Sequence, residues 1–96
     1  RDIVGETVIE GPPDLVVEIL SPSTRHCDLG RKRDLYARYG IPEYWIIDPK
    51  ARDIMVLVLH GARYVQIPND EGVARSMILP DLAVNVAEFF AAAEQW

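Results

Sequence analysis

The 96-residue sequence lacks the features that mark disulfide-bonded, zinc-binding and membrane-spanning proteins. Its one cysteine, Cys27, excludes an internal disulfide, and no group of cysteines and histidines has the spacing of a zinc site. Apolar runs such as residues 54–59 fall far short of the roughly 20 residues that a membrane-spanning helix requires. No basic and apolar leader opens the chain. We therefore expect a cytoplasmic protein of one domain.

The chain also has fewer basic residues than acidic ones. Ten Lys and Arg residues stand against fifteen Asp and Glu, a net charge of -5, which argues against a protein that coats nucleic acid without specificity. The chain does have the composition of a folded protein, because 49% of its residues are hydrophobic and 26% are charged. It begins with Arg1 rather than methionine, so we expect a processed or truncated piece of a longer protein.

The first half of the chain predicts a strand, a helix and a second strand. Residues 15–20 form a β-branched run that is apolar on both faces apart from Glu18, which is typical of a strand buried on both sides. Residues 28–39 predict a helix that ends at Gly40, and residues 44–47 predict another buried strand. The short connections favour a right-handed parallel crossover.

The second half predicts antiparallel structure. Residues 54–59 and 64–67 read as a hairpin, and residues 69–72 as a further turn. We also expect an edge strand within residues 73–79, a terminal helix over residues 87–95, and a weak strand near residues 6–9. The fold class is therefore α/β or α+β with a mixed sheet.

Glu18 is the first candidate for a functional residue. Alternate side chains of a strand share a face, so Glu18 points to the same side as Asp14 and away from Ile19. A carboxylate in a buried strand is costly unless it is paired or bound to a metal. A salt bridge to an arginine, or an edge-strand position facing water, would also explain it.

Lys32 is the second candidate. At about 100° per residue it lies near the centre of the apolar stripe of the predicted helix. A lysine normally lies at the border of such a stripe, where its stem can reach water. An ion pair with Asp28 would support the helix without explaining this position. A carboxylate on the adjoining strand explains it better. If the helix packs on the face of Asp14 and Glu18, the Lys32 amine is predicted to approach those two carboxylates.

Other residues are weaker candidates. His26 and Cys27 are adjacent and do not face each other on a helix, and His60 is expected to be solvated in the hairpin turn. Core packing is favoured over base stacking for four aromatic residues, namely Tyr36, Tyr39, Tyr44 and Trp45. Five basic residues form either a phosphate-facing patch or a solvated helix face: Arg25, Arg31, Lys32, Arg33 and Arg38.

An ordered series of motifs carries a resemblance over nearly the whole chain. The motifs are residues 11–24 (GPPDLVVEILSPST), Asp28, Lys32, Tyr36, residues 40–49 (GIPEYWIIDP), residues 79–82 (LPDL) and residues 86–90 (VAEFF). Together they resemble the putative restriction endonuclease family, which is widespread in cyanobacteria and other bacteria. That family is a branch of the PD-(D/E)XK nuclease superfamily, so the resemblance implies a restriction-endonuclease-like core and DNA as the partner.

The resemblance also implies roles for individual residues. Glu18 matches the metal-binding glutamate of the E-x-K triplet, and the backbone carbonyl of Ile19 would be the accompanying ligand of Mg²⁺ or Mn²⁺. Leu20 occupies the position of the triplet's lysine, which departs from the pattern. Lys32 matches the place to which this family has moved that lysine.

The metal-binding aspartate of the superfamily should lie on a strand that precedes the segment resembling residues 1–10. We therefore expect residues 1–96 to be the C-terminal part of one endonuclease-like domain, truncated at its N-terminus and inactive alone. Asp14 is a weaker candidate ligand. Two alternatives stay open: a non-catalytic binding or oligomerisation module on the same scaffold, and an unrelated enzyme that uses Asp14 and Glu18 as an acid and base. Assembly into a homodimer is also left open.

Overall fold

A computed structural model describes residues 14–20 and 25–93, without the side chains of residues 25–29. The predicted strand at residues 6–9 lies outside this range. The elements are β1 (Leu15–Ile19), α1 (Arg25–Arg38), β2 (Glu43–Asp48), β3 (Asp53–His60), β4 (Arg63–Ile67), β5 (Val73–Arg75), β6 (Ala83–Asn85) and α2 (Val86–Ala93). In the described part of the chain, neither helix is long and apolar enough to cross a membrane.

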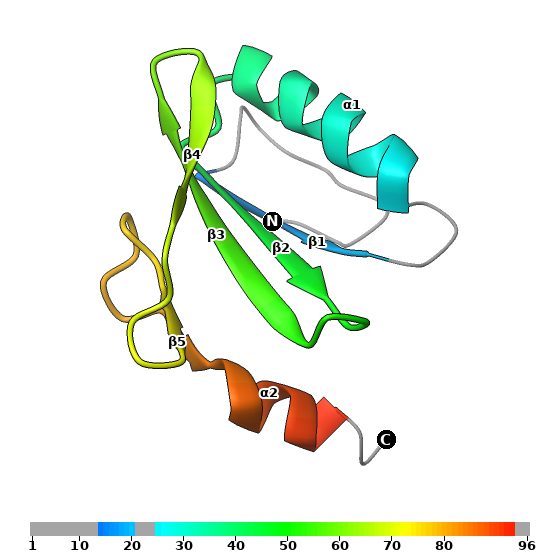
Figure 1. The fold of residues 1–96 in the computed structure, drawn as a ribbon. Coiled ribbons are helices and arrows are strands. Elements are labelled where there is room, and N and C mark those ends of the chain that lie inside the picture. The colour runs from blue at the N-terminus through cyan, green and yellow to red at the C-terminus, as the bar shows by residue number, and fades with distance from the viewer. Residues whose placement is uncertain (1–13, 21–24, 94–96) are drawn as a thin grey trace.

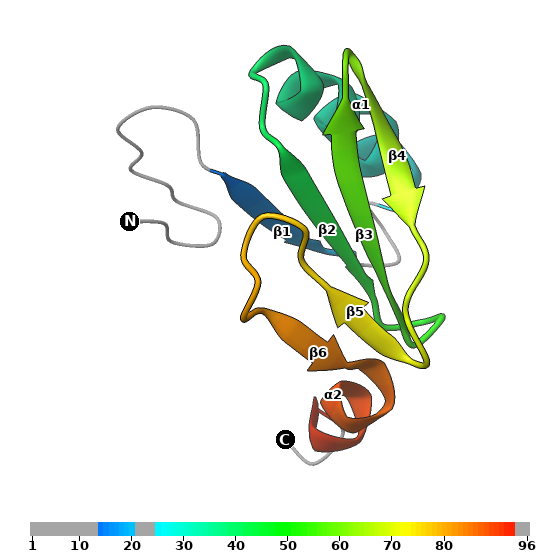
Figure 2. The same ribbon diagram turned by 90° about the vertical axis from the view of Figure 1, so that its left-hand side faces the viewer.

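Four strands form the main sheet, in the order β1-β2-β3-β4 (Figure 2). β1 and β2 are parallel and are joined through α1, whereas β2, β3 and β4 form an antiparallel meander. The parallel crossover, the hairpin and the mixed α/β fold class are thus confirmed. In the parallel pair, Val16 lies opposite Tyr44 and Glu18 lies opposite Ile46.

Each face of the sheet has its own apolar core. On one face, below α1, four residues are buried: Leu20, Tyr44, Ile46 and Leu57. On the other face, the buried residues come from the sheet, from β5 and from α2: Trp45, Ile54, Val56, Ala74 and Phe90. β2 contributes to both cores because its side chains alternate between the two faces of the sheet. Figure 1 shows α1 and α2 on opposite sides of this sheet.

The helix α1 ends as expected and begins earlier. Gly40 has a φ of 71°, which a glycine adopts without a steric penalty. The Gly40 amide donates to the Ala37 carbonyl at 3.0 Å and the Ile41 amide donates to the Tyr36 carbonyl at 3.1 Å, the two bonds of a Schellman motif. The helix starts at Arg25, three residues before the predicted start at residue 28.

The structure corrects two predicted strands. β1 is an edge strand of the described sheet, and Val17 and Ile19 on one of its faces are exposed, so it is not buried on both sides. An apolar run alone cannot distinguish an edge strand from a central one. The strand expected at residues 73–79 is only β5, which pairs with β6 in a separate two-stranded sheet. The chain leaves β5 at Ser76, where side-chain hydrogen bonds start a loop.

The predicted apolar stripe of α1 is also only partly buried. Tyr36 packs against the core below the helix, whereas Leu35 and Tyr39 are 42% and 63% exposed. The difference arises because the stripe is wider than the part of the helix that touches the sheet. The terminal helix, predicted over residues 87–95, is described as α2 from Val86 to Ala93.

Candidate active site

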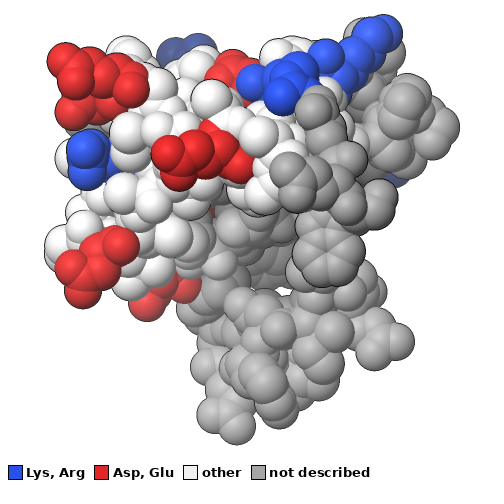
Figure 3. All heavy atoms as spheres, turned by 90° about the horizontal axis from the view of Figure 1, so that it is seen from below, with Lys and Arg blue, Asp and Glu red and all other residues white. Residues whose placement is uncertain are grey.

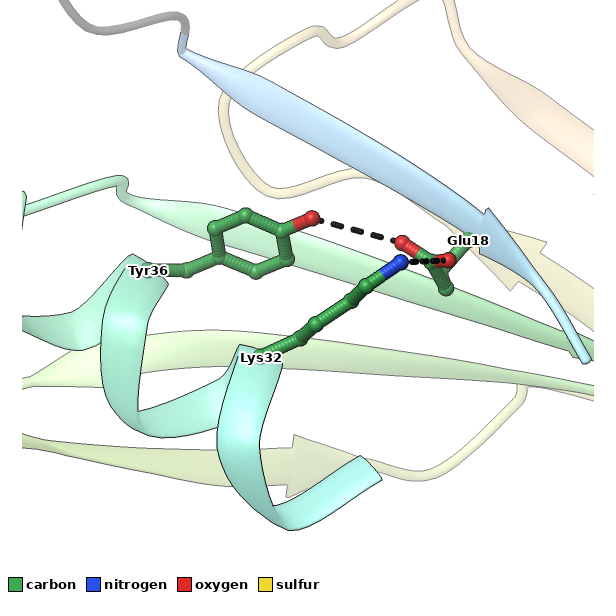
Figure 4. A network of polar contacts seen from close by, with 3 residues as sticks. All are labelled: Glu18, Lys32 and Tyr36. Carbon is green, nitrogen blue, oxygen red and sulfur yellow. Dashed lines mark hydrogen bonds and ion pairs between the residues drawn. The ribbon is translucent and has the colours of Figure 1, made fainter. Parts of the chain in front are cut away.

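An ion pair joins α1 to the edge strand of the sheet. Lys32 Nζ lies 2.7 Å from Glu18 Oε2, at a distance typical of a charge-assisted hydrogen bond (Figure 4). The two side chains are 36% and 18% exposed, so the pair is partly shielded and still reachable from solvent. The contact predicted from the helical position of Lys32 is therefore present, and it accounts for a lysine at the centre of the stripe.

Both oxygens of Glu18 are engaged. Tyr36, one turn after Lys32, donates its hydroxyl to Glu18 Oε1 at 3.3 Å, so the two helix residues hold one oxygen each (Figure 4). Residues four apart lie on the same side of a helix, which is why both side chains reach one carboxylate. Tyr36 is half-buried in this position. The sequence placed Tyr36 in the family motif without indicating this hydrogen bond.

Three tyrosine rings contact one another edge to face beside the ion pair, with Tyr44 in the middle. The Tyr44 ring lies 5.0 Å from that of Tyr36 and 5.7 Å from that of Tyr64, both edge to face. Tyr64 donates its hydroxyl to the Ile41 carbonyl at 2.7 Å, whereas the buried Tyr44 hydroxyl has no hydrogen-bond partner among the described residues. Burial, and then the negative charge of Glu18, raise the pKa of Tyr44 above its ordinary value. Burial also raises the pKa of Tyr64.

The other predicted ligands lie close to Glu18 in sequence. Ile19 is the last residue of β1, and its side chain is exposed on the opposite face. Asp14 is exposed immediately before β1 and forms no hydrogen bond or ion pair with the described residues. Its position on the Glu18 side of the strand follows from the alternation of side chains, but the two carboxylates are separated by four residues of extended chain.

These residues fit a divalent cation only in part. Carboxylate and carbonyl oxygens are suitable ligands for Mg²⁺, which is usually held by one or two carboxylates together with waters and substrate phosphates. Among residues 14–20 and 25–93, no three Asp, Glu, His or Cys side chains are grouped so that they could hold a metal ion. Glu18 is the acidic side chain that the structure shows at the Lys32 amine.

A second glutamate, which the sequence did not single out, lies on the opposite face. Glu43, the first residue of β2, is completely buried. Its Oε2 accepts the indole N–H of Trp45 at 2.6 Å, and its Oε1 accepts the backbone N–H groups of Met77 at 2.8 Å and Ile78 at 3.3 Å. The Glu43-x-Trp45 spacing was a usable signal, because residues two apart on a strand share a face and a buried indole N–H needs an acceptor.

The weaker candidates from the sequence differ in where the structure places them. His60 is exposed at the hairpin, as expected, and the side chains of His26 and Cys27 lie outside the described part. Tyr44 and Trp45 belong to the two cores, which confirms the packing interpretation for them. Tyr39 does not, since most of its surface is exposed.

A family model for a putative restriction endonuclease, Uma2, matches residues 1–87. The chain belongs to this family. The match covers all the elements that build the Glu18–Lys32 pair, and it indicates a nuclease-like function for the fold that carries them. No curated protein matches the chain.

Proposed function

We propose that the chain is part of a metal-dependent DNA endonuclease of the PD-(D/E)XK type. The observation that carries the proposal is the contact between Glu18 on β1 and Lys32 on α1 in a member of a restriction endonuclease family. A carboxylate and an ammonium group 2.7 Å apart, partly shielded and still accessible, are the groups that phosphodiester hydrolysis requires from the protein.

Each residue of the pair has a distinct role in the proposal. Glu18 is a ligand of Mg²⁺ or Mn²⁺, with the backbone carbonyl of Ile19 beside it. The bound ion supplies Lewis-acid chemistry at the phosphate. Lys32 has three N–H donors and no acceptor, so its ammonium group can orient an attacking water and stabilise negative charge on the scissile phosphate. Tyr36 holds the second oxygen of Glu18 and thereby limits the rotation of the carboxylate.

The ligand set needs a second acidic residue. The superfamily resemblance implies an aspartate on another strand, and Asp14 is the nearest acidic alternative on the Glu18 side of β1. Replacing Asp14 with Asn in the intact protein separates these possibilities. Full cleavage by the Asp14→Asn variant would assign the second ligand to the other strand.

Cleavage of DNA by the intact protein tests the proposal. With Mg²⁺ or Mn²⁺ we expect nicking of plasmid DNA, and the Glu18→Gln and Lys32→Met variants should each lose activity by about 100-fold or more, since the charges they remove supply several kcal/mol. Glu88→Gln is the matched control, because Glu88 is exposed on α2. Equal nicking by the wild type and both variants would remove these two assignments.

A second candidate function is a non-catalytic binding or oligomerisation module. It is favoured by one observation, namely that both oxygens of Glu18 are already bonded to Lys32 and Tyr36. Calorimetric titration with Mn²⁺ distinguishes the two candidates. Binding that Glu18→Gln abolishes supports the nuclease, whereas the absence of binding to the intact protein supports the module.

A further inference from the structure

One side of α1 is exposed next to the Glu18–Lys32 pair. We call the four residues on it the α1 strip: Arg31, Leu35, Arg38 and Tyr39. All four are exposed, although the spacing of Leu35 and Tyr39 predicted burial. An exposed tyrosine and leucine beside two arginines are unusual on a solvated helix face, which is normally charged and polar throughout.

Helix geometry places Tyr39 of the α1 strip almost in line with Lys32. At 100° and 1.5 Å per residue, Tyr39 lies about 20° around the helix from Lys32 and about 10 Å further along it. Leu35 lies about 60° around the helix from Lys32 in the same direction, and Arg31 and Arg38 lie about 100° and 120° from it, on the outer border of the same side. The Tyr39 amide still donates to the Leu35 carbonyl at 3.2 Å, so Tyr39 keeps its helical position. The α1 strip thus leads directly away from the ion pair.

The charge around the α1 strip is opposite to that of the protein. Residues 25–39 hold five Lys and Arg against two Asp, whereas the rest of the chain holds five basic residues against thirteen acidic ones. Figure 3 views the molecule from the end that carries α2, where several separate acidic areas are visible together with basic ones. α1 is therefore a local basic element on an acidic protein.

The α1 strip also has free binding capacity. Arg31 and Arg38 form no ion pair within the described chain, and the Tyr39 hydroxyl and ring have no partner there. The other described aromatic rings are already engaged. Tyr44 contacts Tyr36 and Tyr64 edge to face, Phe89 contacts Phe90 in the same way, and Trp45 is buried. Tyr39 is thus the aromatic side chain beside the candidate site that can still stack on a ligand.

We propose that the α1 strip binds a single-stranded segment of nucleic acid, with a base stacked on Tyr39 and its phosphates held by Arg31 and Arg38. Stacking on an exposed ring requires a base that is not paired inside a duplex, and neighbouring arginines supply the phosphate contacts. The proposal rests on the proposed nuclease function for the identity of the ligand. About 10 Å separates Tyr39 from Lys32, so the stacked base lies two or three nucleotides from the phosphate that Lys32 would contact.

Fluorescence anisotropy tests this proposal without cleavage. The intact protein is titrated against a labelled single-stranded oligonucleotide and the corresponding duplex, in EDTA. We expect tighter binding of the single strand, and Tyr39→Ala should weaken it by about 5- to 150-fold, the range of one stacked base. Tyr39→Phe, which keeps the ring, should bind like the wild type. Photocrosslinking with an iododeoxyuridine oligonucleotide should modify Tyr39.

The arginines are tested by the salt dependence of the same binding. The double variant Arg31→Gln/Arg38→Gln should reduce the slope of log K against log salt concentration by about 1.4, because each phosphate contact on a single strand contributes about 0.7. Arg63→Gln, an exposed arginine on β4, is the matched control and should leave the slope unchanged.

Three results would overturn the proposal: no binding of single strands by the wild type, unchanged binding by Tyr39→Ala, or equal effects of Arg63→Gln and the double variant. Failure of the nuclease function would look different. In that case DNA would stay intact with Mg²⁺ or Mn²⁺, while the Tyr39-dependent binding in EDTA would remain.

Discussion

Two glutamates on opposite faces of the same sheet show how differently one side chain can be used. Glu18 lies on β1, keeps 18% of its side chain exposed and bonds to the side chains of Lys32 and Tyr36. Glu43 lies on the neighbouring strand β2, is fully buried and accepts three N–H groups, two of them from the backbone. No lysine, arginine or histidine of the described chain pairs with Glu43.

The difference separates a structural carboxylate from a candidate functional one. Two of the donors to Glu43 are backbone N–H groups of a loop, the first of them 34 residues further along the chain, so these bonds tie the loop after β5 to the main sheet. Such a buried group cannot exchange partners without leaving polar atoms unsatisfied. Glu18 can exchange, because its partners are flexible side chains next to solvent. Burial and the type of donor, rather than the residue itself, distinguish the two.

The largest effect should come from removing the charge of Glu43. In Glu43→Gln one acceptor oxygen becomes an NH₂ group that faces another N–H, so we expect a loss of about 2–3 kcal/mol in the free energy of unfolding. Urea denaturation measures this loss. Glu18→Gln should cost much less stability, since its carboxylate is partly solvated. Equal losses for the two variants would contradict the distinction between these glutamates.

Alkaline pH should destabilise the protein through the tyrosines on the Glu18 face. The pKa of Tyr44 and of Tyr64 is raised in the folded state, whereas a tyrosine in the unfolded chain titrates near 10. Their contribution is complete below pH 10 and decreases as the pH rises above it, because the unfolded chain releases its protons first. The slope per group is at most about 1.4 kcal/mol per pH unit. Urea midpoints at pH 9, 10 and 11 measure it, and Tyr44→Phe should have a smaller slope.

At neutral pH the same substitution should stabilise the protein. In the part of the chain that the structure describes, the buried Tyr44 hydroxyl has no hydrogen-bond partner. Tyr44→Phe removes this unsatisfied polar group and should add about 1 kcal/mol to the free energy of unfolding. Tyr64→Phe is the matched control. It makes the same chemical change where the hydroxyl donates to Ile41, and it should destabilise by about 1 kcal/mol. Thermal or urea unfolding that shows both variants shifted in one direction would rule out this account.

The smallest effect should come from the ion pair itself. Lys32→Met should cost less than about 1 kcal/mol, because a partly exposed pair is weakened by solvent. The cost should decrease between about 0.05 and 0.5 M NaCl as the charges are screened. The destabilisation by Glu43→Gln should not decrease, since the hydrogen bonds lost there are buried. If the loss of unfolding free energy in Lys32→Met does not depend on the salt concentration, packing rather than charge stabilises the contact.

The candidate site could be predicted from local patterns to a large extent. Alternation in the first strand put Glu18 on one face, and helical spacing put Lys32 at the centre of a stripe. Both periodicities come from backbone geometry over fewer than ten residues, and the short connections between the elements bring the two side chains together. The hydrogen bond from Tyr36 to Glu18 could not be predicted in this way, because it also depends on how α1 is rotated about its axis over the sheet.

Other features depend on contacts between distant segments. The backbone donors to Glu43 follow it by 34 and 35 residues. The short strands β5 and β6 pair with each other and contribute Ala74 and Val84 to the core on the second face of the sheet. The exposure of Tyr39 likewise depends on where α1 stops touching the sheet. No local spacing encodes these placements.

The sequence by itself determined that this chain is a mixed α/β domain with a carboxylate on its first described strand and a lysine facing it from the following helix. Its single cysteine excluded an internal disulfide, and its excess of acidic residues argued against a protein that coats nucleic acid without specificity. The tertiary structure alone decided which glutamate is locked among backbone donors and which keeps access to solvent. It also left one tyrosine on α1 uncovered. Periodicity specifies the face of an element, but the depth of a side chain depends on what packs over that face.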